Sequence, residues 1–548
     1  MKKHLVLLLL ILSIAATLRL YKLGQIPEGF HADEAAFGYN AYSLLETGKD
    51  EYGVAYPLIF KSFGDDKGAL YSYLSIPFIA LFDLNEFSVR LPTALFGIIA
   101  VYITYVLILH LTKERNVALI AALFHAVNPS AVLLSRVQSE PLVFGVVFFM
   151  GLLYWLFWVK NNRLLFLFIS TILLSLASLG SLTTRMFLFV FIPILIFTER
   201  IYKNRTQLLL TAAVYLVLIS CSVVAFSGGK VDRVMQVNPF MKLDVQLPLD
   251  ESIREDGVMN KTGVITRIMH NKVFAYGRSI SRLAFSYISP EFLFFESLEP
   301  IREKLPDTGI LFLIEFPFIL AGLYFMYRYA MRWRFLVVLW ILFGIISLSF
   351  ASAESPNIHR FYILLLPIHL ITSFGLVYLM KAISNKRNKI IFAITVLFLF
   401  CVSEWFFLHQ LFIHQPVHFP FYRGYAYKEL MQKVPKYYSK YSKIIITKGN
   451  ENPYIFVLFY SAYDPKQYQL SGSHRDIDYQ GFDKYIFVPY DCPSFNEASP
   501  QPKIVYDKSM LFIQRGGCAL GPNDKLVDKI YWREGSEAFQ LVEYQETN

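Results

Sequence analysis

Long apolar stretches recur through most of this chain and constrain its fold more than any other feature. A helix needs roughly 20 residues to cross ~30 Å of hydrocarbon, and about eleven stretches before residue 412 approach that length. Only 17% of the residues are charged, whereas soluble proteins carry roughly 25%. The pattern predicts an α-helical polytopic membrane protein with about 11 transmembrane helices. The predicted spans are 5–21, 88–111, 117–134, 140–159, 164–181, 186–199, 207–227, 309–328, 335–351, 361–380 and 390–411.

Some of these stretches are short, so we expect tilted or partial spans and helices interrupted at Pro141 and Pro193. The first stretch also has a second interpretation, because MKKH is a basic start and SIAA resembles the cleavage site of a signal peptide. The apolar run continues through Leu20 without a clear processing motif, which favours a retained span. Cleavage would leave the sidedness of the later segments unchanged.

Lysines and arginines gather in the loops on one side of the predicted spans. The positive-inside rule makes that side cytoplasmic, so we expect a multi-pass plasma-membrane protein with a cytoplasmic N-terminus. The same clustering relates the net charge of +10 to membrane topology and argues against a nucleic-acid partner. The basic loop residues are Lys2, Lys3, Lys113, Arg115, Lys160, Arg163, Arg200, Lys203, Arg205, Arg328, Arg332, Arg334, Lys381, Lys386, Arg387 and Lys389.

The chain divides into a predicted membrane domain, 1–411, and an extracytoplasmic tail, 412–548. The tail reads as a small α/β domain, with a helical GYAYKELMQKVPKYYSKY, short β-rich runs and a terminal hairpin in DKIYWREGSEAFQLVEY. Cys492 and Cys518 lie in the tail and can pair if it faces an oxidising compartment. The long loop 228–308 mixes Arg, Phe and Tyr, which is typical of helices lying along a membrane surface.

Two short acidic motifs lie in the first outer loop, 22–87. Asp33 and Glu34 stand at or just before a predicted helix, where the helix dipole favours a carboxylate; the plainer interpretation makes Asp33 an N-cap. Asp66 and Lys67 precede an apolar run. Lys67 can reach a lipid phosphate as a point charge, although lysines near apolar helices also commonly extend toward the interface.

Further charged residues are predicted on the same outer face, close to the hydrocarbon. Charges at that depth are costly unless they are paired or functional. A structural ion-pair network is one explanation, and a site for an anionic lipid headgroup is the other. These residues are Arg136, Glu140, Arg185, His359 and Arg360.

The sequence resembles the glycosyltransferase C superfamily, in the branch of dolichyl-phosphate-mannose:protein mannosyltransferases and aminoarabinose transferases. The resemblance is carried by LRLYKLG followed by HADEAAFGYNAY, by DDKGALYSYLSIPFIALFDLNEFSVRLPTALFG, and later by HRFYILLLPIHLITSFG. It covers about 1–410 and says little about the tail.

The resemblance implies a role for several of these residues. Asp33 becomes the catalytic base with Glu34 beside it, Asp66 and Lys67 match an acid–Lys pair, and Lys67 becomes a ligand of the donor phosphate. Glu140 stands where relatives have a second acidic residue, usually Asp. Gly68-Ala69 replaces a pair of prolines found in many relatives.

The implied reaction moves a sugar from a polyprenyl-phosphate donor to an extracytoplasmic protein, lipid or cell-envelope glycan. One carboxylate can take the acceptor proton, and cations stabilise the departing phosphate; Lys67, Arg136 and Arg360 are the first candidates, with Arg185 and His359 nearby on the same face. Membrane lipids are further partners. The sequence contains no metal-ligand cluster, while the resemblance remains compatible with a divalent metal.

Two other functions remain open from the sequence. A lipid-linked glycan ligase or polymerase would use the arginines of loop 228–308, namely Arg254, Arg267, Arg278 and Arg282. A transporter or flippase would place charges near the midplane of the membrane. Glu315 is an exception among spans that otherwise carry almost no acidic residues.

Overall fold

The computed structural model describes residues 2–63, 65–180, 182–227, 243–259, 263–297, 299–329, 331–351, 356–418, 420–448, 452–471, 481–495 and 509–544. The chain forms two compact units. The helical unit comprises Met1–Tyr21, Thr93–Ser135 and Ser139–Leu408, and the mixed unit comprises Lys22–Pro92, Arg136–Gln138 and His409–Asn548.

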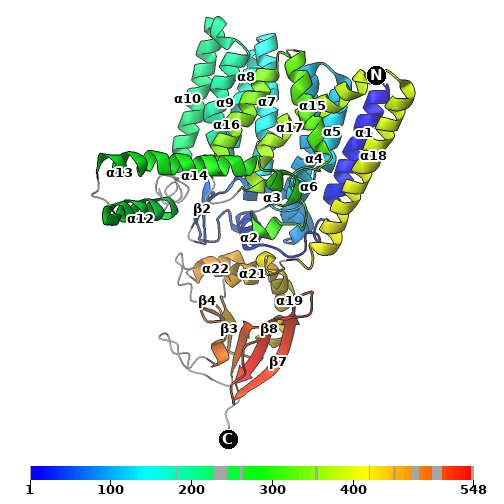
Figure 1. The fold of residues 1–548 in the computed structure, drawn as a ribbon. Coiled ribbons are helices and arrows are strands. Elements are labelled where there is room, and N and C mark those ends of the chain that lie inside the picture. Colours follow the sequence, from blue (N-terminus) through cyan, green and yellow to red (C-terminus); the bar gives the residue numbers. More distant parts are fainter. Residues whose placement is uncertain are drawn as a thin grey trace. The chain divides into compact units, whose positions relative to one another are not determined.

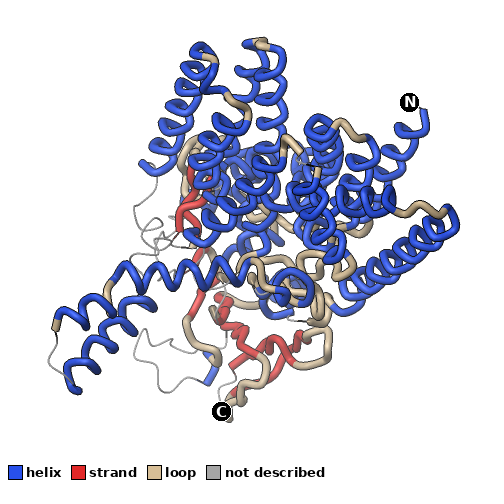
Figure 2. Tube along the Cα trace, turned by 45° about the horizontal axis from the view of Figure 1, so that its top comes forward, coloured by secondary structure: helices blue, strands red, loops and turns tan. Residues whose placement is uncertain are grey.

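The helical unit is a bundle of apolar helices (Figures 1 and 2). Every predicted span contains a helix, and the span 117–134 contains two, because an apolar run can satisfy its own backbone hydrogen bonds only as a helix in lipid. The helices are α1 (Lys2–Leu20), α4 (Glu86–Thr112, which begins in the mixed unit), α5 (Arg115–Val127), α6 (Pro129–Leu134), α7 (Glu140–Asn161), α8 (Leu164–Gly180), α9 (Leu182–Thr198), α10 (Arg205–Ser227), α15 (Glu315–Arg328), α16 (Arg334–Ala351), α17 (Ile358–Ala382) and α18 (Lys386–His409).

Six of the helices in the described part of the chain are long and apolar enough to cross a membrane, and α5 with α6 would make a seventh if that bent pair is one span. The bend between them is 57°. It occurs where Asn128 caps α6 and Pro129 begins it, because proline supplies no backbone N–H for a continuing helix. The predicted spans at α8, α9 and α16 are shorter apolar helices, and α15 has only 14 residues.

The expected interruptions at Pro141 and Pro193 were wrong. Pro141 lies in the first turn of α7, where a missing N–H costs nothing. Pro193 lies inside α9, and the helix continues through it to Thr198. An apolar helix of the first outer loop, α3 (Leu70–Phe82), was not among the predicted spans.

The described part of loop 228–308 is largely helical, with α12 (Leu243–Met259), α13 (Val264–Met269) and α14 (Lys272–Tyr287). Figure 1 shows α14 running across the direction of α7, α8, α9 and α16. Tyr276, Leu283 and Tyr287 are its buried residues, while Phe274 and Phe285 are exposed. The helix thus has a buried side and an exposed apolar side, and its placement along a membrane surface stays a prediction.

The mixed unit contains a six-stranded sheet in the order β4-β5-β3-β6-β8-β7. β3 is parallel to β5 and β6, and the other neighbours are antiparallel. The predicted α/β tail and terminal hairpin are therefore confirmed. The strands are β3 (Lys443–Thr447), β4 (Gly481–Phe482), β5 (Tyr485–Val488), β6 (Met510–Arg515), β7 (Asp524–Tyr531) and β8 (Glu537–Tyr544).

The main core of the mixed unit joins the first outer loop to the tail. Helix α2 (Ala32–Thr47) contributes residues to one apolar cluster with one face of the sheet and with three helices of the tail. Phe30, for example, packs against Phe459 with ring centroids 4.6 Å apart. The compact unit therefore extends beyond the predicted boundary at residue 412. The three helices are α19 (Tyr425–Lys433), α21 (Pro453–Tyr460) and α22 (Pro465–Leu470).

Two further features complete the mixed unit. The hairpin of β1 (Ile59–Ser62) and β2 (Asp65–Gly68) precedes α3, and it pairs Phe60 with Lys67. Cys492 and Cys518 form a disulfide, as the sequence allowed.

Candidate active site

The start of α2 fixes the position of the Asp33–Glu34 motif. His31 is the N-cap: its Nδ1 accepts a hydrogen bond from the Asp33 backbone N–H, and the Glu34 side chain accepts one from the His31 backbone N–H. Such reciprocal bonds satisfy amide groups that have no partner within the helix. The plainer interpretation of Asp33 as the N-cap is therefore wrong, and its carboxylate is left available for other contacts.

Glu34 is buried in an ion-pair network. Its carboxylate accepts hydrogen bonds from Arg90 Nε at 3.0 Å and Nη2 at 3.2 Å, and from the Gln138 backbone N–H at 3.0 Å. Arg423 Nη2 lies 3.6 Å from the same carboxylate. Arg90 also donates to the carbonyls of Pro27 and Gly29. Glu34 therefore holds several segments of the mixed unit together.

Burial by itself would raise the pKa of Glu34. The charges of Arg90 and Arg423, with the hydrogen bonds from Arg90 and Gln138, outweigh burial and lower the pKa below its ordinary value. The network therefore favours the charged form of Glu34. That state suits a residue that positions the Asp33 loop better than one that exchanges protons.

Asp33 lies in the first turn of α2 and forms an ion pair with Lys67, whose Nζ contacts its Oδ1. The other oxygen lies 3.4 Å from His31 Nδ1. The Asp33 side chain remains 27% exposed and that of Lys67 12% exposed. Both groups of the pair thus retain some access to solvent, in contrast to Glu34.

The β1–β2 hairpin places Lys67 beside α2. Ser62 Oγ lies 3.4 Å from its ammonium nitrogen, and the Phe63 ring centroid lies 4.8 Å away. The structure therefore brings Asp33 and Lys67, 34 positions apart in the sequence, into direct contact. The side chain of Asp66 lies outside the described part of the chain.

Arg136 is fully buried in the mixed unit. Its Nη2 donates to the Ile26 carbonyl at 2.9 Å, and its guanidinium carbon lies 5.4 Å from the Phe412 ring centroid. These contacts join the segment before α2 to the start of the tail. They support a structural role for this arginine.

The predicted residues of the helical unit include a second polar cluster. Ser139 Oγ and His359 Nδ1 are 2.8 Å apart, and His359 Nε2 lies 3.7 Å from Glu303 Oε2. Glu140 begins α7 directly after Ser139, and Arg360 follows His359 in the first turn of α17. Glu140 and Arg360 are both half-buried.

Arg185 has a different environment within the helical unit. It is buried, and its Nε donates to the Ser178 carbonyl at 2.9 Å, near the end of α8. A cation at that place satisfies carbonyls that the helix leaves without partners. For Arg185, this contact supports a structural role over a role in binding a lipid headgroup.

Asp33, Glu34, Lys67 and Arg136 thus gather in the mixed unit, while Glu140, His359 and Arg360 gather in the helical unit. A common site for the two groups stays a prediction. In the described residues, no three His, Cys, Asp or Glu side chains are grouped to hold a metal ion.

Sequence reasoning missed two functional partners, Arg90 and Arg423. Arg90 lies within the RLPTALFG segment, which carries part of the family resemblance. Its position in that segment could have singled it out. Arg423 gave no such signal, because it lies in the tail and meets Glu34 only through the fold.

Known proteins resemble the chain in sequence and in structure. Residues 66–224 match the family described as dolichyl-phosphate-mannose-protein mannosyltransferase. No curated protein sequence matches the chain significantly. ArnT from Cupriavidus metallidurans superimposes with a TM-score of 0.51 in the apo state, at 9% identity over 97% of both chains. The same protein bound to undecaprenyl phosphate gives a TM-score of 0.53, at 10% identity over 97% of both chains.

The archaeal oligosaccharyltransferase AglB from Archaeoglobus fulgidus, solved with an inhibitory peptide and a dolichol-phosphate, superimposes with a TM-score of 0.49 at 12% identity. The match covers 84% of this chain but only 63% of AglB. Part of this integral membrane protein, residues 66–224, is thus similar to a mannosyltransferase family, and the chain as a whole shares the fold of ArnT.

Proposed function

We propose that this protein is an inverting glycosyltransferase that moves a sugar from a polyprenyl-phosphate donor to an extracytoplasmic acceptor. The observation that carries the proposal is the Asp33–Lys67 pair at the first turn of α2. It combines a carboxylate that can accept a proton with a cation that can bind a phosphate. The fold shared with a protein solved with undecaprenyl phosphate supports a donor of this class.

In the proposed reaction, an acceptor hydroxyl attacks C1 of the sugar. The C1–oxygen bond to the phosphate breaks, and its electron pair leaves with the phosphate oxygen. The proton of the hydroxyl passes to the Asp33 carboxylate as the new glycosidic bond forms. A single displacement inverts the anomeric centre, and one base is sufficient because the leaving phosphate needs no proton.

Lys67 has two partners in this scheme. Before the donor binds, its ammonium is paired with Asp33. When the donor phosphate takes Lys67, the carboxylate is released for the acceptor hydroxyl, and the ammonium stabilises the charge that develops on the departing phosphate. Arg360 and His359 of the helical unit are proposed as further phosphate ligands.

The proposed sidedness places the N-terminus in the cytoplasm and the mixed unit outside it. The Cys492–Cys518 disulfide supports this orientation, because disulfides persist in oxidising extracytoplasmic compartments. The basic loops of the helical unit support the same orientation.

A ligase or polymerase would place its chemistry in loop 228–308. The described arginines Arg254, Arg267, Arg278 and Arg282 lie on exposed positions of α12, α13 and α14. The acid–Lys pair lies in the first outer loop instead, which favours the transferase. The match to a mannosyltransferase family argues against a transporter or flippase.

The decisive experiment incubates the purified full-length protein with a panel of polyprenyl-phosphate sugars and measures donor hydrolysis or transfer. We expect Asp33→Asn to lose at least about 100-fold in rate, because proton transfer to a positioned base contributes roughly 10²–10⁴-fold. Glu46→Gln is the matched control, since Glu46 is exposed in the last turn of the same helix. Wild-type turnover by Asp33→Asn would remove the proposed base.

A further inference from the structure

A cavity of about 320 Å³ lies in the mixed unit, in a part of the tail that the proposed reaction does not use. This volume is at the lower end of the range for small-molecule sites, about 300–1,000 Å³. Its walls combine aromatic rings with cationic and acidic side chains. The lining residues come from the ends of β3 and β6, from the β7–β8 hairpin, and from the segment 420–433 that includes α19.

The sheet topology explains why these residues meet. Thr447 ends β3 and Arg515 ends β6, and these two strands are parallel. β8 begins at Glu537, and Phe539 is paired with Arg515. The carboxyl ends of β3, β6 and β7 therefore lie at one edge of the sheet with the amino end of β8. Ligands of open α/β sheets commonly bind outside the carboxyl ends of the strands.

Aromatic rings form two kinds of surface in this cavity. Tyr427 and Phe539 are buried, with ring centroids 5.2 Å apart, and belong to the core of the unit. Trp532 and Phe421 are only half-buried, with ring centroids 6.0 Å apart. Core packing explains the first pair. The second pair leaves aromatic surface facing the cavity, where its burial by a ligand would be favourable.

The charged groups of the cavity are mixed in sign. The Arg515 guanidinium carbon lies 5.3 Å from the Phe421 ring centroid, and Asp491 Oδ2 lies 3.2 Å from its Nη1. Glu537 accepts a hydrogen bond from Gln540 and contacts Lys529. Lys448 supplies another cation. A phosphate site would be expected to lack the acid, and an aliphatic ligand would not need these polar groups.

We propose that this cavity binds one pyranose unit of the acceptor, so that the acceptor is a glycan or a glycosylated molecule. A pyranose has apolar C–H faces that suit Trp532 and Phe421. Its hydroxyls both donate and accept hydrogen bonds, which suits cations and Glu537 in the same cavity. That the bound sugar belongs to the acceptor rests on the proposed function, whereas the sugar site itself rests on the cavity.

The cavity is connected to the Asp33 loop within the mixed unit. Phe421 lines the cavity, and Arg423 of the same short helix, η6 (Pro420–Arg423), lies against Glu34. Arg423 also donates to the Glu28 carbonyl, and Arg533 of the β7–β8 turn contacts the Glu28 carboxylate. A sugar held in the cavity would thus be bound by the same unit that carries the proposed base.

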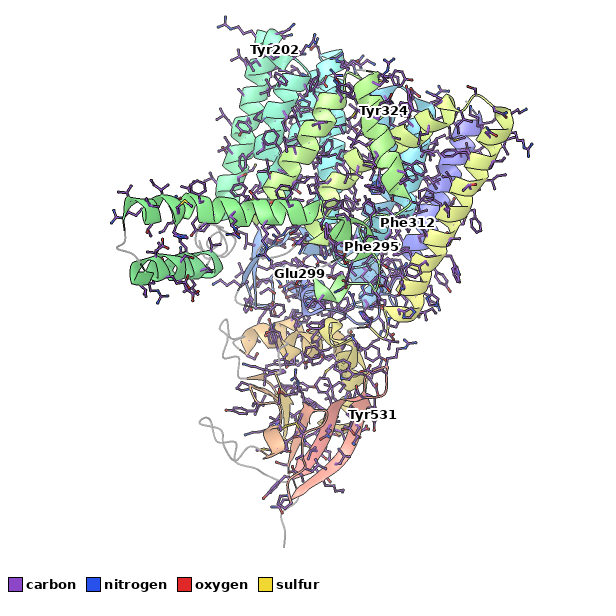
Figure 3. The ribbon with its side chains drawn as sticks, in the orientation of Figure 1. Tyr202, Phe295, Glu299, Phe312, Tyr324 and Tyr531 are labelled. Atoms are coloured by element: carbon purple, nitrogen blue, oxygen red, sulfur yellow. A yellow bond between two sulfur atoms is a disulfide. The ribbon has the colours of Figure 1, made fainter. Side chains whose placement is uncertain are left out.

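The test measures binding of methyl pyranosides and short oligosaccharides to the full-length protein by saturation-transfer NMR, with no donor present. We expect saturable binding in the wild type and about tenfold weaker binding in Trp532→Ala, because tenfold corresponds to about 1.4 kcal/mol and one aromatic contact is of that size. Tyr531→Ala is the matched control. Tyr531, labelled in Figure 3, precedes Trp532 and is 45% exposed. It is not among the residues that line the cavity.

A second variant keeps the test valid if Trp532→Ala fails to fold. Lys448→Gln changes a different strand end and is expected to weaken pyranoside binding at an unchanged melting temperature. Equal binding in all four proteins, or no saturable binding of any sugar, would overturn the site. Saturable binding of aromatic peptides in place of sugars would overturn it in favour of a peptide site.

The same measurements separate this inference from the proposed function. Sugar binding that depends on Trp532, combined with no consumption of any polyprenyl-phosphate sugar, would leave the cavity assignment standing and reject the transferase. Transfer activity without saturable pyranoside binding would support the transferase and reject the cavity assignment.

Discussion

Lys67 pairs with the Asp33 carboxylate and is proposed to bind the donor phosphate. Its substitution tests the proposed phosphate role. Lys67→Ala should raise the KM for the polyprenyl-phosphate donor at least about tenfold, because a charge-assisted hydrogen bond of about 1.5–3 kcal/mol is lost. The KM for the acceptor should change little. Steady-state kinetics with each substrate varied in turn measures both.

Lys61→Ala is the matched control for Lys67→Ala, because Lys61 is exposed on the same hairpin. It should retain wild-type donor kinetics. If Lys67→Ala altered only the acceptor KM, the phosphate role of Lys67 would be rejected.

Glu51 is a buried carboxyl group near the proposed site. Its backbone N–H donates to Asn40 Oδ1 at 3.0 Å, and its Oε1 accepts from Asn40 Nδ2 at 3.1 Å. Burial raises the pKa of Glu51 to about 8, with Asp50 raising it further, although the hydrogen bond from Asn40 and the charge of Lys67 oppose the rise. The folded protein therefore holds a proton on Glu51 that the unfolded chain releases near its ordinary pKa of 4.5.

This raised pKa makes stability depend on pH. The folded state binds more protons than the unfolded state between about pH 4.5 and pH 8, so the stability from this group is complete below that window and is lost as the pH rises through it. We expect the melting temperature in detergent to fall from pH 6 to pH 8 and then to level off. Glu51→Gln should flatten this decline, and an unchanged slope in that variant would contradict the assignment.

Among the secondary-structure elements, the start of α2 depends on the buried ion pair of Glu34 with Arg90. Glu34 closes the capping box of α2 and binds Arg90 near the start of α4. Glu34→Ala leaves Arg90 buried without its carboxylate, and breaking a buried pair in this way typically costs about 3–5 kcal/mol. We expect a marked fall in melting temperature together with reduced transfer.

A double-substitution cycle tests whether Glu34 and Arg90 act together. Arg90→Leu combined with Glu34→Ala should destabilise less than the sum of the two single changes, because the second change removes an already unpaired charge. Additive losses would show that the two residues contribute independently.

The topology of the whole molecule yields a test that does not involve activity. In a background of Cys221→Ser and Cys401→Ser, Lys466→Cys should react with a membrane-impermeant maleimide on cells whose cytoplasmic membrane is intact. Lys386→Cys should react only after that membrane is permeabilised. Both original side chains are exposed, and Lys466 lies in the tail whereas Lys386 begins α18. Labelling in the opposite order would invert the proposed orientation.

The membrane helices and the strands of the tail were predictable because their signals are local. An apolar run must form its own hydrogen bonds in lipid, so the runs now seen as α7 and α17 were visible without tertiary information. The β-rich KIIIT became β3 for the same kind of reason, because strand propensity and flanking turns act over a few residues. The resemblance assigned roles to Asp33 and Lys67, but their contact appears only in the folded structure.

Local sequence patterns were enough to infer a polytopic helical membrane protein with an α/β tail, and they drew attention to Asp33 and Lys67. Tertiary structure alone decided that His31 caps α2, that Glu34 is held by Arg90 and Arg423, and that the first outer loop shares a core with the tail. The physical reason is the range of the interactions. Hydrophobic runs and strand patterns are properties of neighbouring residues, whereas buried ion pairs and the cavity beside Trp532 join residues that are hundreds of positions apart or come from separate strands.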